Sequence, residues 1–309
     1  MEKNRVWLII IFAVIVYLVM GIYADFGSLL SAMEKFNWIF IPVMLILVIV
    51  AYIIRFLKWT LFLKSVGVNL KLKDNLFVFF SGMGMIITPA KVGEIWKGWL
   101  IKDINGESLS KTVPVVITDR VTDVIGLVIL SLLGILYYRA GIYILIALIL
   151  VFTGLVIAIR SEKISGKLIS ILEKRAGKYS KDIKTMHTTF LQLMNPKNMV
   201  GLSFLSAFAW FFECLAFYFV IMGFGQSIGV ILSTFVFSFA TLIGAVSMIP
   251  GGIGVAEATI SGLLQYFGLT STDAVGAMLI IRFGTFWFGA ILGFSVHFIF
   301  RKRIMGNKN

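Results

Sequence analysis

The sequence is poor in the residues from which most metal sites and nucleophilic sites are built. It has one cysteine, Cys214, and two histidines, His187 and His297, which lie far apart. A single cysteine excludes an intrachain disulfide and a cysteine-based metal site. No Walker motif and no cysteine/histidine metal spacing is present. The sequence therefore predicts that the chain is not an enzyme and has no catalytic residue, no metal site and no cofactor.

Acidic residues are also scarce, with 15 Asp and Glu against 28 Lys and Arg and a formal net charge of +13. Such a charge raises the question of a nucleic-acid partner, but the basic residues cluster at the ends of apolar segments. Nine of them fall within 160–198. This clustering is the one that the positive-inside rule gives for cytoplasmic segments next to membrane spans. We expect a membrane protein with no nucleic-acid partner.

Long apolar runs dominate the chain, which is 59% hydrophobic with a mean hydropathy of +0.98. Runs near twenty residues are long enough to cross a bilayer as helices. We predict an all-α, multi-pass protein of the cell membrane, with residues 1–309 forming one domain. About six full spans are expected, at 6–23, 38–60, 112–136, 141–159, 199–222 and 273–299. Val6–Tyr23 is interpreted as a retained span, because Ile22 and Ala24 make a poor signal-peptide cleavage site.

The basic residues also orient the spans. The segments expected outside contain only two basic residues, Lys35 and Arg139; these segments are 24–37, 137–140, 223–228 and 268–272. Both termini and 61–75, 102–111 and 160–198 then lie in the cytoplasm, which gives an N-in/C-in topology. Apolar residues recur at roughly helical spacing within 160–198, which predicts an amphipathic linker on the inner leaflet.

The same broken pattern occurs twice inside apolar sequence. The first copy contains Pro89, Gly93 and Glu94, and the second contains Pro250, Gly251, Gly252, Gly254 and Glu257. Each is followed by an apolar segment with one arginine, Arg120 or Arg282, so that proline and arginine lie 31 and 32 residues apart. We predict two re-entrant helical hairpins, 76–101 and 229–267, with these prolines and glycines at the tips. The alternative for 229–248 is a full span.

The hairpins belong to two predicted repeats, 38–137 and 199–299. Three crossings separate the starts of the repeats, so the repeats have opposite orientations. Inverted repeats with discontinuous helices are the usual build of secondary transporters, whose site lies near the midplane between the halves.

Charged residues inside the apolar segments are the candidates for function, because a charge in the bilayer core needs a partner or water. Glu94 and Glu257 are expected to pair with Arg120 and Arg282. The predicted path for a polar headgroup is formed by Lys91, Glu94, Asp119, Arg120, Asp123, Glu213, Glu257 and Arg282. The alternative is that these pairs only hold the hairpins against the helices. Arg55 and Lys58 are equally well explained as snorkelling side chains at the cytoplasmic interface.

The glycines after Pro250 predict an anion site. A helix resuming near Ile253 would direct its first N–H groups into the cavity, where they could bind phosphate, and Lys91 would add positive charge at the other tip. A tight turn without a ligand is the alternative.

At these residues the sequence resembles the flippase-like integral membrane family that includes the membrane domain of lysylphosphatidylglycerol synthases (multiple peptide resistance factors). The resemblance covers roughly 40–299. Its motif elements are Arg55-x-x-Lys58-Trp59, Pro89-x-Lys91-x-Gly93-Glu94, Ser110-Lys111, Asp119-Arg120-x-x-Asp123, Pro250-Gly-Gly-Ile-Gly254-x-x-Glu257 and Arg282. Two departures bear on the headgroup: Lys91 stands where the family more often has Arg, and Ile86-Ile87 stand near where it often has Asn.

The resemblance implies movement of a lipid between leaflets. The expected substrate is an aminoacyl-phospholipid or a polyprenyl-phosphate-linked lipid, with a separate lipid-modifying enzyme as a conceivable partner; a homo-oligomer is compatible with the sequence. Two other functions remain open. One is a membrane-embedded enzyme or partner subunit acting on a lipid phosphate, which would need a metal at Asp119 and Asp123. The other is a small-solute secondary transporter.

Overall fold

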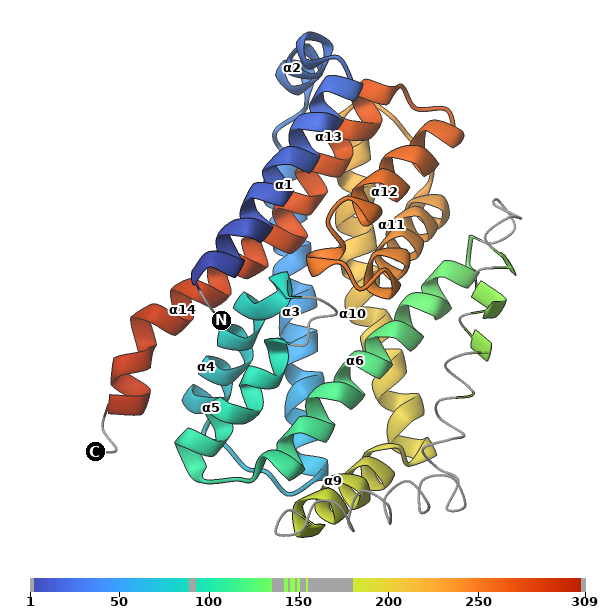
Figure 1. Cartoon of the computed structure of the whole chain (residues 1–309). Coiled ribbons are helices and arrows are strands. Elements are labelled where there is room, and N and C mark those ends of the chain that lie inside the picture. Colours follow the sequence, from blue (N-terminus) through green and yellow to red (C-terminus); the bar gives the residue numbers. More distant parts are fainter. Residues whose placement is uncertain are drawn as a thin grey trace.

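The computed structural model describes residues 3–88, 93–134 and 180–306, together with isolated positions between 142 and 154. The described residues are helical and contain no strand (Figure 1). In chain order the elements are α1 (Lys3–Tyr23), α2 (Phe26–Lys35), α3 (Phe40–Ser65), α4 (Leu72–Met83), the 3-10 helix η1 (Gly84–Ile87), α5 (Trp96–Asn105), α6 (Leu109–Leu132), α9 (Ser180–Leu193), α10 (Pro196–Gly223), α11 (Val230–Val246), the 3-10 helix η4 (Pro250–Gly252), α12 (Val255–Tyr266), α13 (Ser271–Arg282), the π-helix η5 (Phe283–Trp287) and α14 (Phe288–Met305).

The centre of the molecule is formed by two long helices, α3 and α10, which pack side by side (Figure 1). They have 26 and 28 residues, or about 39 and 42 Å at 1.5 Å per residue, which exceeds the roughly 30 Å of a bilayer core. The start of α10 is well defined, because Asn195 accepts a hydrogen bond from the Lys197 N–H and Pro196 occupies the first helical position.

Three described helices are long and apolar enough to cross a membrane: Phe40–Ser65, Pro196–Gly223 and Ser271–Ile304. A fourth is added if α1 and α2, which are bent by 89° relative to each other, form one span. The expected span 112–136 overlaps α6, which is continuous but carries four charged residues: Lys111, Asp119, Arg120 and Asp123. Of the expected span 141–159, the structure describes only isolated positions between 142 and 154.

Both predicted hairpins are broken into two short helices. The first consists of α4 with η1, then α5, and the second of α11, then η4 and α12; the two short helices of each pack together. Gly251 and Gly252 adopt φ of 63° and 65° at the second break, a left-handed conformation that glycine adopts at little cost. With 17 residues, α11 is about 26 Å long and folds back onto α12, as half of a hairpin would. The first break contains Pro89 and Lys91, which lie outside the described residues.

The breaks meet inside the molecule, where η1 contacts η4. Behind them, α14 packs closely on η1, since a Cβ on Gly293 would come within 2.2 Å of the Gly84 nitrogen. The element order of long helix, short helix, break, short helix and long helix occurs once in 40–132 and again in 196–305.

Of the predicted linker 160–198, the structure describes the part from Ser180 onward. There α9 buries Thr189 and Leu193. Two hydrogen bonds connect α9 to α3 and α6: Gln192 donates to the Ser65 carbonyl (2.6 Å), and Ser110 donates to Asp182 (3.1 Å). In Figure 1, α9 and α2 lie at opposite ends of the molecule.

Candidate functional site

A buried lysine links three helices at the centre of the structure. The side chain of Lys58, on α3, is 1% exposed, and its Nζ contacts carboxylate oxygens of Asp119 (3.0 Å) and Asp123 on α6. It also donates to Thr122 Oγ1 at 3.2 Å and to Ser206 Oγ, on α10, at 3.1 Å. An ammonium group with this many acceptors is compensated for its loss of water.

Arg120 joins the same carboxylates to the first hairpin. Its guanidinium lies 2.6 Å from Asp119 Oδ2, 2.9 Å from Asp123 Oδ2 and 3.3 Å from Glu94 Oε1. The other oxygen of Glu94 pairs with Lys97 Nζ at 2.7 Å. Glu94 follows the first break directly, and Lys97 lies in α5. This charged network therefore holds the start of α5 against α6.

The second hairpin is held by Arg282 at the end of α13. Arg282 Nε donates to Glu257 Oε1 at 2.7 Å and Nη2 donates to the Gly251 carbonyl at 2.9 Å. The second oxygen of Glu257 accepts the Gly254 N–H at 2.7 Å, which is one half of a capping box, since Gly254 has no side chain to accept a hydrogen bond in return. Tyr17, from α1, donates to Glu257 Oε1 at 3.4 Å and accepts from Trp287 Nε1 at 2.8 Å.

A third ion pair joins the two central helices. Arg55 Nη1, on α3, lies 2.6 Å from Glu213 Oε1, on α10. The guanidinium carbon of Arg55 also lies 4.0 Å from the centre of the Trp210 ring, in a cation–π contact.

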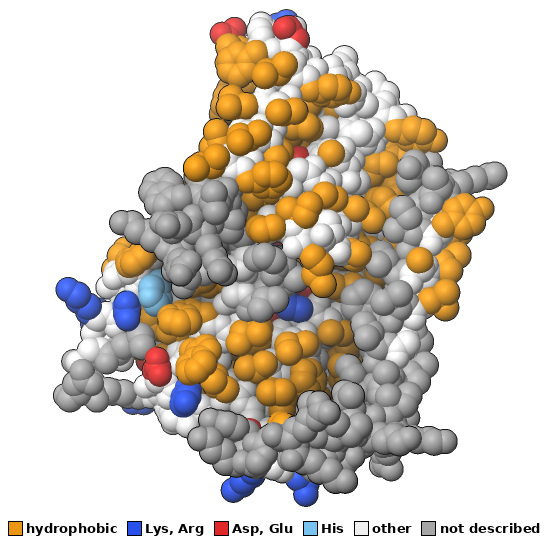
Figure 2. All heavy atoms as spheres, in the orientation of Figure 1, with side chains coloured by type: hydrophobic (Ala, Val, Ile, Leu, Met, Phe, Trp, Pro, Cys, Tyr) orange, Lys and Arg blue, Asp and Glu red, His pale blue; other side chains and the backbone are white. Residues whose placement is uncertain are grey.

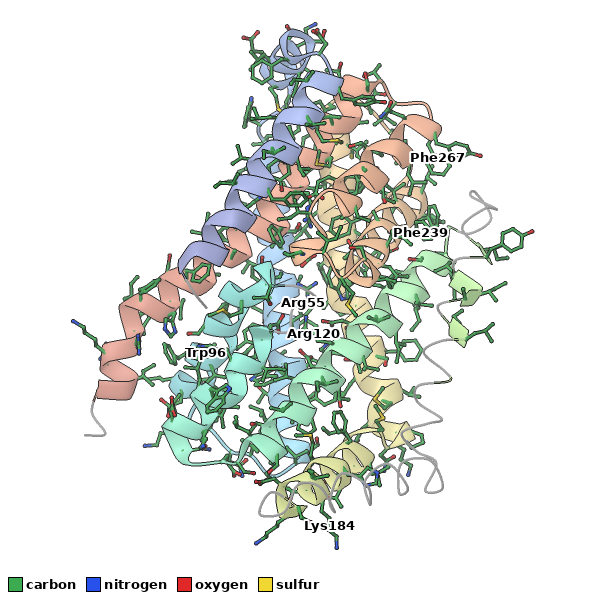
Figure 3. The ribbon with its side chains drawn as sticks, in the orientation of Figure 1. Arg55, Trp96, Arg120, Lys184, Phe239 and Phe267 are labelled. Atoms are coloured by element: carbon green, nitrogen blue, oxygen red, sulfur yellow. The ribbon has the colours of Figure 1, made fainter. Side chains whose placement is uncertain are left out.

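These groups surround a cavity of about 430 Å³ between the two halves of the chain. Its walls come from α3, α6, α10, α11, α12, η1 and η4, and from Arg282 with Thr285 and Phe286 of η5. The charged residues that line it are Arg55, Arg120, Asp123, Glu213 and Arg282. In Figure 3, Arg55 and Arg120 lie close together near the middle of the molecule, where α3 and α6 cross. The volume falls within the range of about 300–1,000 Å³ for ligand pockets.

The predicted pairs Glu94–Arg120 and Glu257–Arg282 are both present. Arg120, Asp123, Glu213 and Arg282 line the cavity, as do Gly251 and Gly252 from the second tip. Glu94, Asp119 and Glu257 are 4%, 2% and 0% exposed and stand behind the wall, where they hold the arginines. At the first tip, the Gly93 N–H donates to Thr88 Oγ1 at 2.7 Å, while Pro89 and Lys91 lie outside the described residues.

The anion site expected at the start of α12 is altered by its own carboxylate. The helix begins at Val255, and Glu257 takes the Gly254 N–H that would have been free to bind phosphate. The positive charge at the cavity wall comes from the arginine side chains instead.

Sequence reasoning missed the roles of Lys58, Lys97 and Arg55. The snorkelling interpretation of Lys58 is wrong, because the side chain is buried and points to α6 rather than to the interface. Charge balance was the available signal for a buried lysine. Asp119 and Asp123 lie one turn apart on an apolar helix, and Arg120 alone cannot neutralise them and Glu94, so a further cation was to be expected. Lys97, three residues after Glu94, lies one turn away on the same face and could have been found by that spacing.

Asp119 and Asp123 do not form an open metal site. The Lys58 ammonium lies between them, where a cation shared by both carboxylates would have to bind. The described part of the chain holds no group of three or more His, Cys, Asp or Glu side chains with metal-binding geometry.

A G-x-S-x-G sequence, Gly225–Gly229, is present in the loop between α10 and α11. In hydrolases this pattern acts as a nucleophile elbow at a turn from strand to helix. Here it follows a helix, and Ser227 is exposed. The sequence therefore does not mark a nucleophile.

The fold and the buried ion pairs define a polytopic helical membrane protein with a central cavity, whose mainly apolar wall carries a few charged side chains. The family model for the lysylphosphatidylglycerol synthase TM region matches residues 8–293, and the chain belongs to this family. Similar curated proteins are UPF0104 membrane proteins. That of Pyrococcus horikoshii is 26% identical over 93% of this chain and 95% of its own length. One of Methanothermobacter thermautotrophicus is 22% identical over 94% of both chains, and one of Methanocaldococcus jannaschii is 25% identical over 68% of this chain and 92% of its own.

Proposed function

We propose that the protein is a flippase-like transporter of the cell membrane that moves a lipid with a polar or charged headgroup between leaflets. The observation that carries the proposal is the cavity of about 430 Å³ between the two halves, which is lined by three arginines and two carboxylates. A site of this kind at membrane depth is costly and is usually functional.

The surroundings of the cavity favour a lipid over a water-soluble solute. Its remaining wall is largely apolar and includes Ile117 and Val124 on α6 and Val246, Met248 and Ile249 near η4. Ile117, Val246 and Met248 are also 39%, 46% and 66% exposed. Figure 2 shows basic atoms at the centre of a face whose side chains above and below are mainly hydrophobic. A headgroup could enter from this side while the tails stay in the hydrocarbon.

The chain architecture fits alternating access. We infer that the matching element orders in 40–132 and 196–305 are inverted repeats, with α4–η1–α5 and α11–η4–α12 as re-entrant hairpins whose tips meet near the midplane. Irregular backbone is tolerated at that depth where it is buried in protein or lines a cavity.

In this function the carboxylates behind the wall are positioning residues. Glu94 and Asp119 hold Arg120, and Glu257 holds Arg282, so that the guanidinium groups face the headgroup. Transport would be driven by the lipid gradient or by a proton gradient.

Lipid translocation in proteoliposomes tests the proposal. Headgroup-labelled lipids are reconstituted with the protein, and an impermeant quencher reports the leaflet of the label. The double variant Arg282→Gln/Glu257→Gln removes one buried pair without leaving an uncompensated charge. A charge-assisted hydrogen bond is worth about 1.5–3 kcal/mol, so we expect translocation to slow by about tenfold to a hundredfold.

Lys184→Gln is the control, because Lys184 projects from α9 at the far end of the molecule from the cavity (Figure 3). It should leave the rate unchanged. The proposal would be refuted if the wild type moved no lipid faster than empty liposomes do. Uptake of a soluble solute would then support a transporter of small solutes.

A further inference from the structure

The carboxylate oxygens Asp123 Oδ2 and Glu213 Oε1 at the cavity lie in ion pairs with Arg120 and Arg55, whereas several guanidinium N–H groups have no partner in the described part of the chain. Arg55 Nε and Nη2 and Arg120 Nε are buried without a hydrogen-bond partner among the described residues. A buried donor left unpaired costs about 1–3 kcal/mol, so three of them in one wall indicate that a ligand with acceptor oxygens completes the site.

The ion pairs around the cavity are oriented with the cation inward. The side chains of Arg120, Arg55 and Arg282 are 25%, 14% and 10% exposed. The partners that neutralise them from behind are less accessible, with 5% for the Glu94 side chain and 0% for that of Glu257. A ligand in the cavity therefore meets guanidinium groups first.

The two carboxylates that do line the cavity are already engaged. Asp123 Oδ1 accepts from Lys58 and Ser206, its Oδ2 pairs with Arg120 at 2.9 Å, and Glu213 pairs with Arg55 at 2.6 Å. A ligand ammonium group would have to displace one of these cations, and removing a partner from a buried pair is strongly unfavourable.

We infer that the cavity selects a headgroup that carries an anionic phosphate and no cationic amine, and that Arg55 and Arg120 donate to the phosphate oxygens. The planar guanidinium matches phosphate in geometry and binds it through paired hydrogen bonds. This inference rests on the proposed function of the same cavity. It adds a preference that the proposed function does not contain: an acidic phospholipid should bind better than its lysylated form.

Two readouts test it. The first is translocation of labelled phosphatidylglycerol and lysylphosphatidylglycerol in the same proteoliposome assay. The second is binding of the short-chain forms of both lipids to the detergent-purified protein, which calorimetry measures. We expect phosphatidylglycerol to be bound and moved at least tenfold better.

The variant Arg55→Gln/Glu213→Gln removes two of the three unpaired donors while it keeps the local charge balanced. It should weaken phosphatidylglycerol binding by about tenfold and leave lysylphosphatidylglycerol binding nearly unchanged. Circular dichroism checks that the variant is folded, and Lys184→Gln serves again as the control that removes a distant positive charge.

Equal or better binding of the lysylated lipid would overturn the inference and leave the proposed transport intact. Selective binding of phosphatidylglycerol without translocation of any lipid would support the inference and refute transport. Failure of both lipids to bind would overturn the inference. Inorganic phosphate, titrated in the same way, identifies the source of the anion: binding as tight as that of phosphatidylglycerol would mean that the site takes free phosphate, and would overturn the assignment to a lipid.

Discussion

Individual charged residues show how an apolar chain tolerates ions. Lys58 is compensated by two carboxylates and two hydroxyl groups, and its removal would leave Asp119 and Asp123 with Arg120 as their remaining cation. The buried lysine is therefore a structural requirement of the site as well as part of its charge balance.

We predict that Lys58→Met destabilises the protein by about 3–5 kcal/mol, the usual cost of breaking a buried ion pair. Unfolding of the detergent-solubilised protein by SDS measures the change. Lys64→Met is the matched control, since Lys64 lies in the last turn of the same helix and is exposed; its effect should stay within about 0.5 kcal/mol. Equal effects of the two substitutions would contradict the burial argument.

Tyr17 is one of the contacts between α1 and the second hairpin. Tyr17→Phe removes a hydroxyl group that bridges Glu257 and Trp287, and we expect a loss of about 1 kcal/mol and slower lipid translocation. In Tyr23→Phe the lost hydrogen bond, to Gln265, is exposed, and both stability and translocation should be retained. A larger effect at Tyr23 than at Tyr17 would refute this role of α1.

At the scale of elements, close backbone approach decides how the hairpins sit against the long helices. Gly293 on α14 leaves no room for a side chain against the backbone of Gly84 in η1. The same arrangement keeps η1 at the cavity wall, where Ile86 contributes to the lining.

We therefore expect Gly293→Ala to destabilise the protein and to slow transport, because backbone rather than a flexible side chain would have to move. The midpoint of thermal unfolding and the translocation rate measure both effects. Gly262→Ala on α12 has open space around the new methyl group and should be neutral or stabilising by up to about 1 kcal/mol. If the two glycines tolerated alanine equally, the close packing of α14 on η1 would be wrong.

At the scale of the whole molecule, the proposed inverted repeat makes a prediction about which side of the membrane each loop faces. Asn69 lies between α3 and α4, and Ser227 lies in the corresponding position between α10 and α11; both are exposed. In Asn69→Cys and Ser227→Cys, an impermeant maleimide should label cysteine 227 in intact cells and cysteine 69 only after permeabilisation. The native Cys214 is buried and should not react. Labelling of both positions from one side would exclude an inverted repeat.

The sequence by itself determined the class of protein, the two breaks and the two glutamate–arginine pairs. Composition suffices for the class, because only a bilayer makes so many apolar runs stable. Proline and glycine act on the local backbone, so their effect is visible without a fold. The pairs follow from their repeated spacing and from the rule that a charge in the membrane needs a partner.

Only the tertiary structure decided which groups face the cavity and which stand behind it. Lys58 and Asp123 are 65 residues apart and meet because α3 packs beside α6 and α10, an arrangement that no local pattern in either helix specifies. The anion site shows the same limit in part: Glu257 bonds the Gly254 N–H by a local pattern at the helix start, whereas Arg282 reaches the Gly251 carbonyl, 31 residues away, only through helix packing. The packing of distant helices thus turned a predicted backbone site into a cavity lined by arginines.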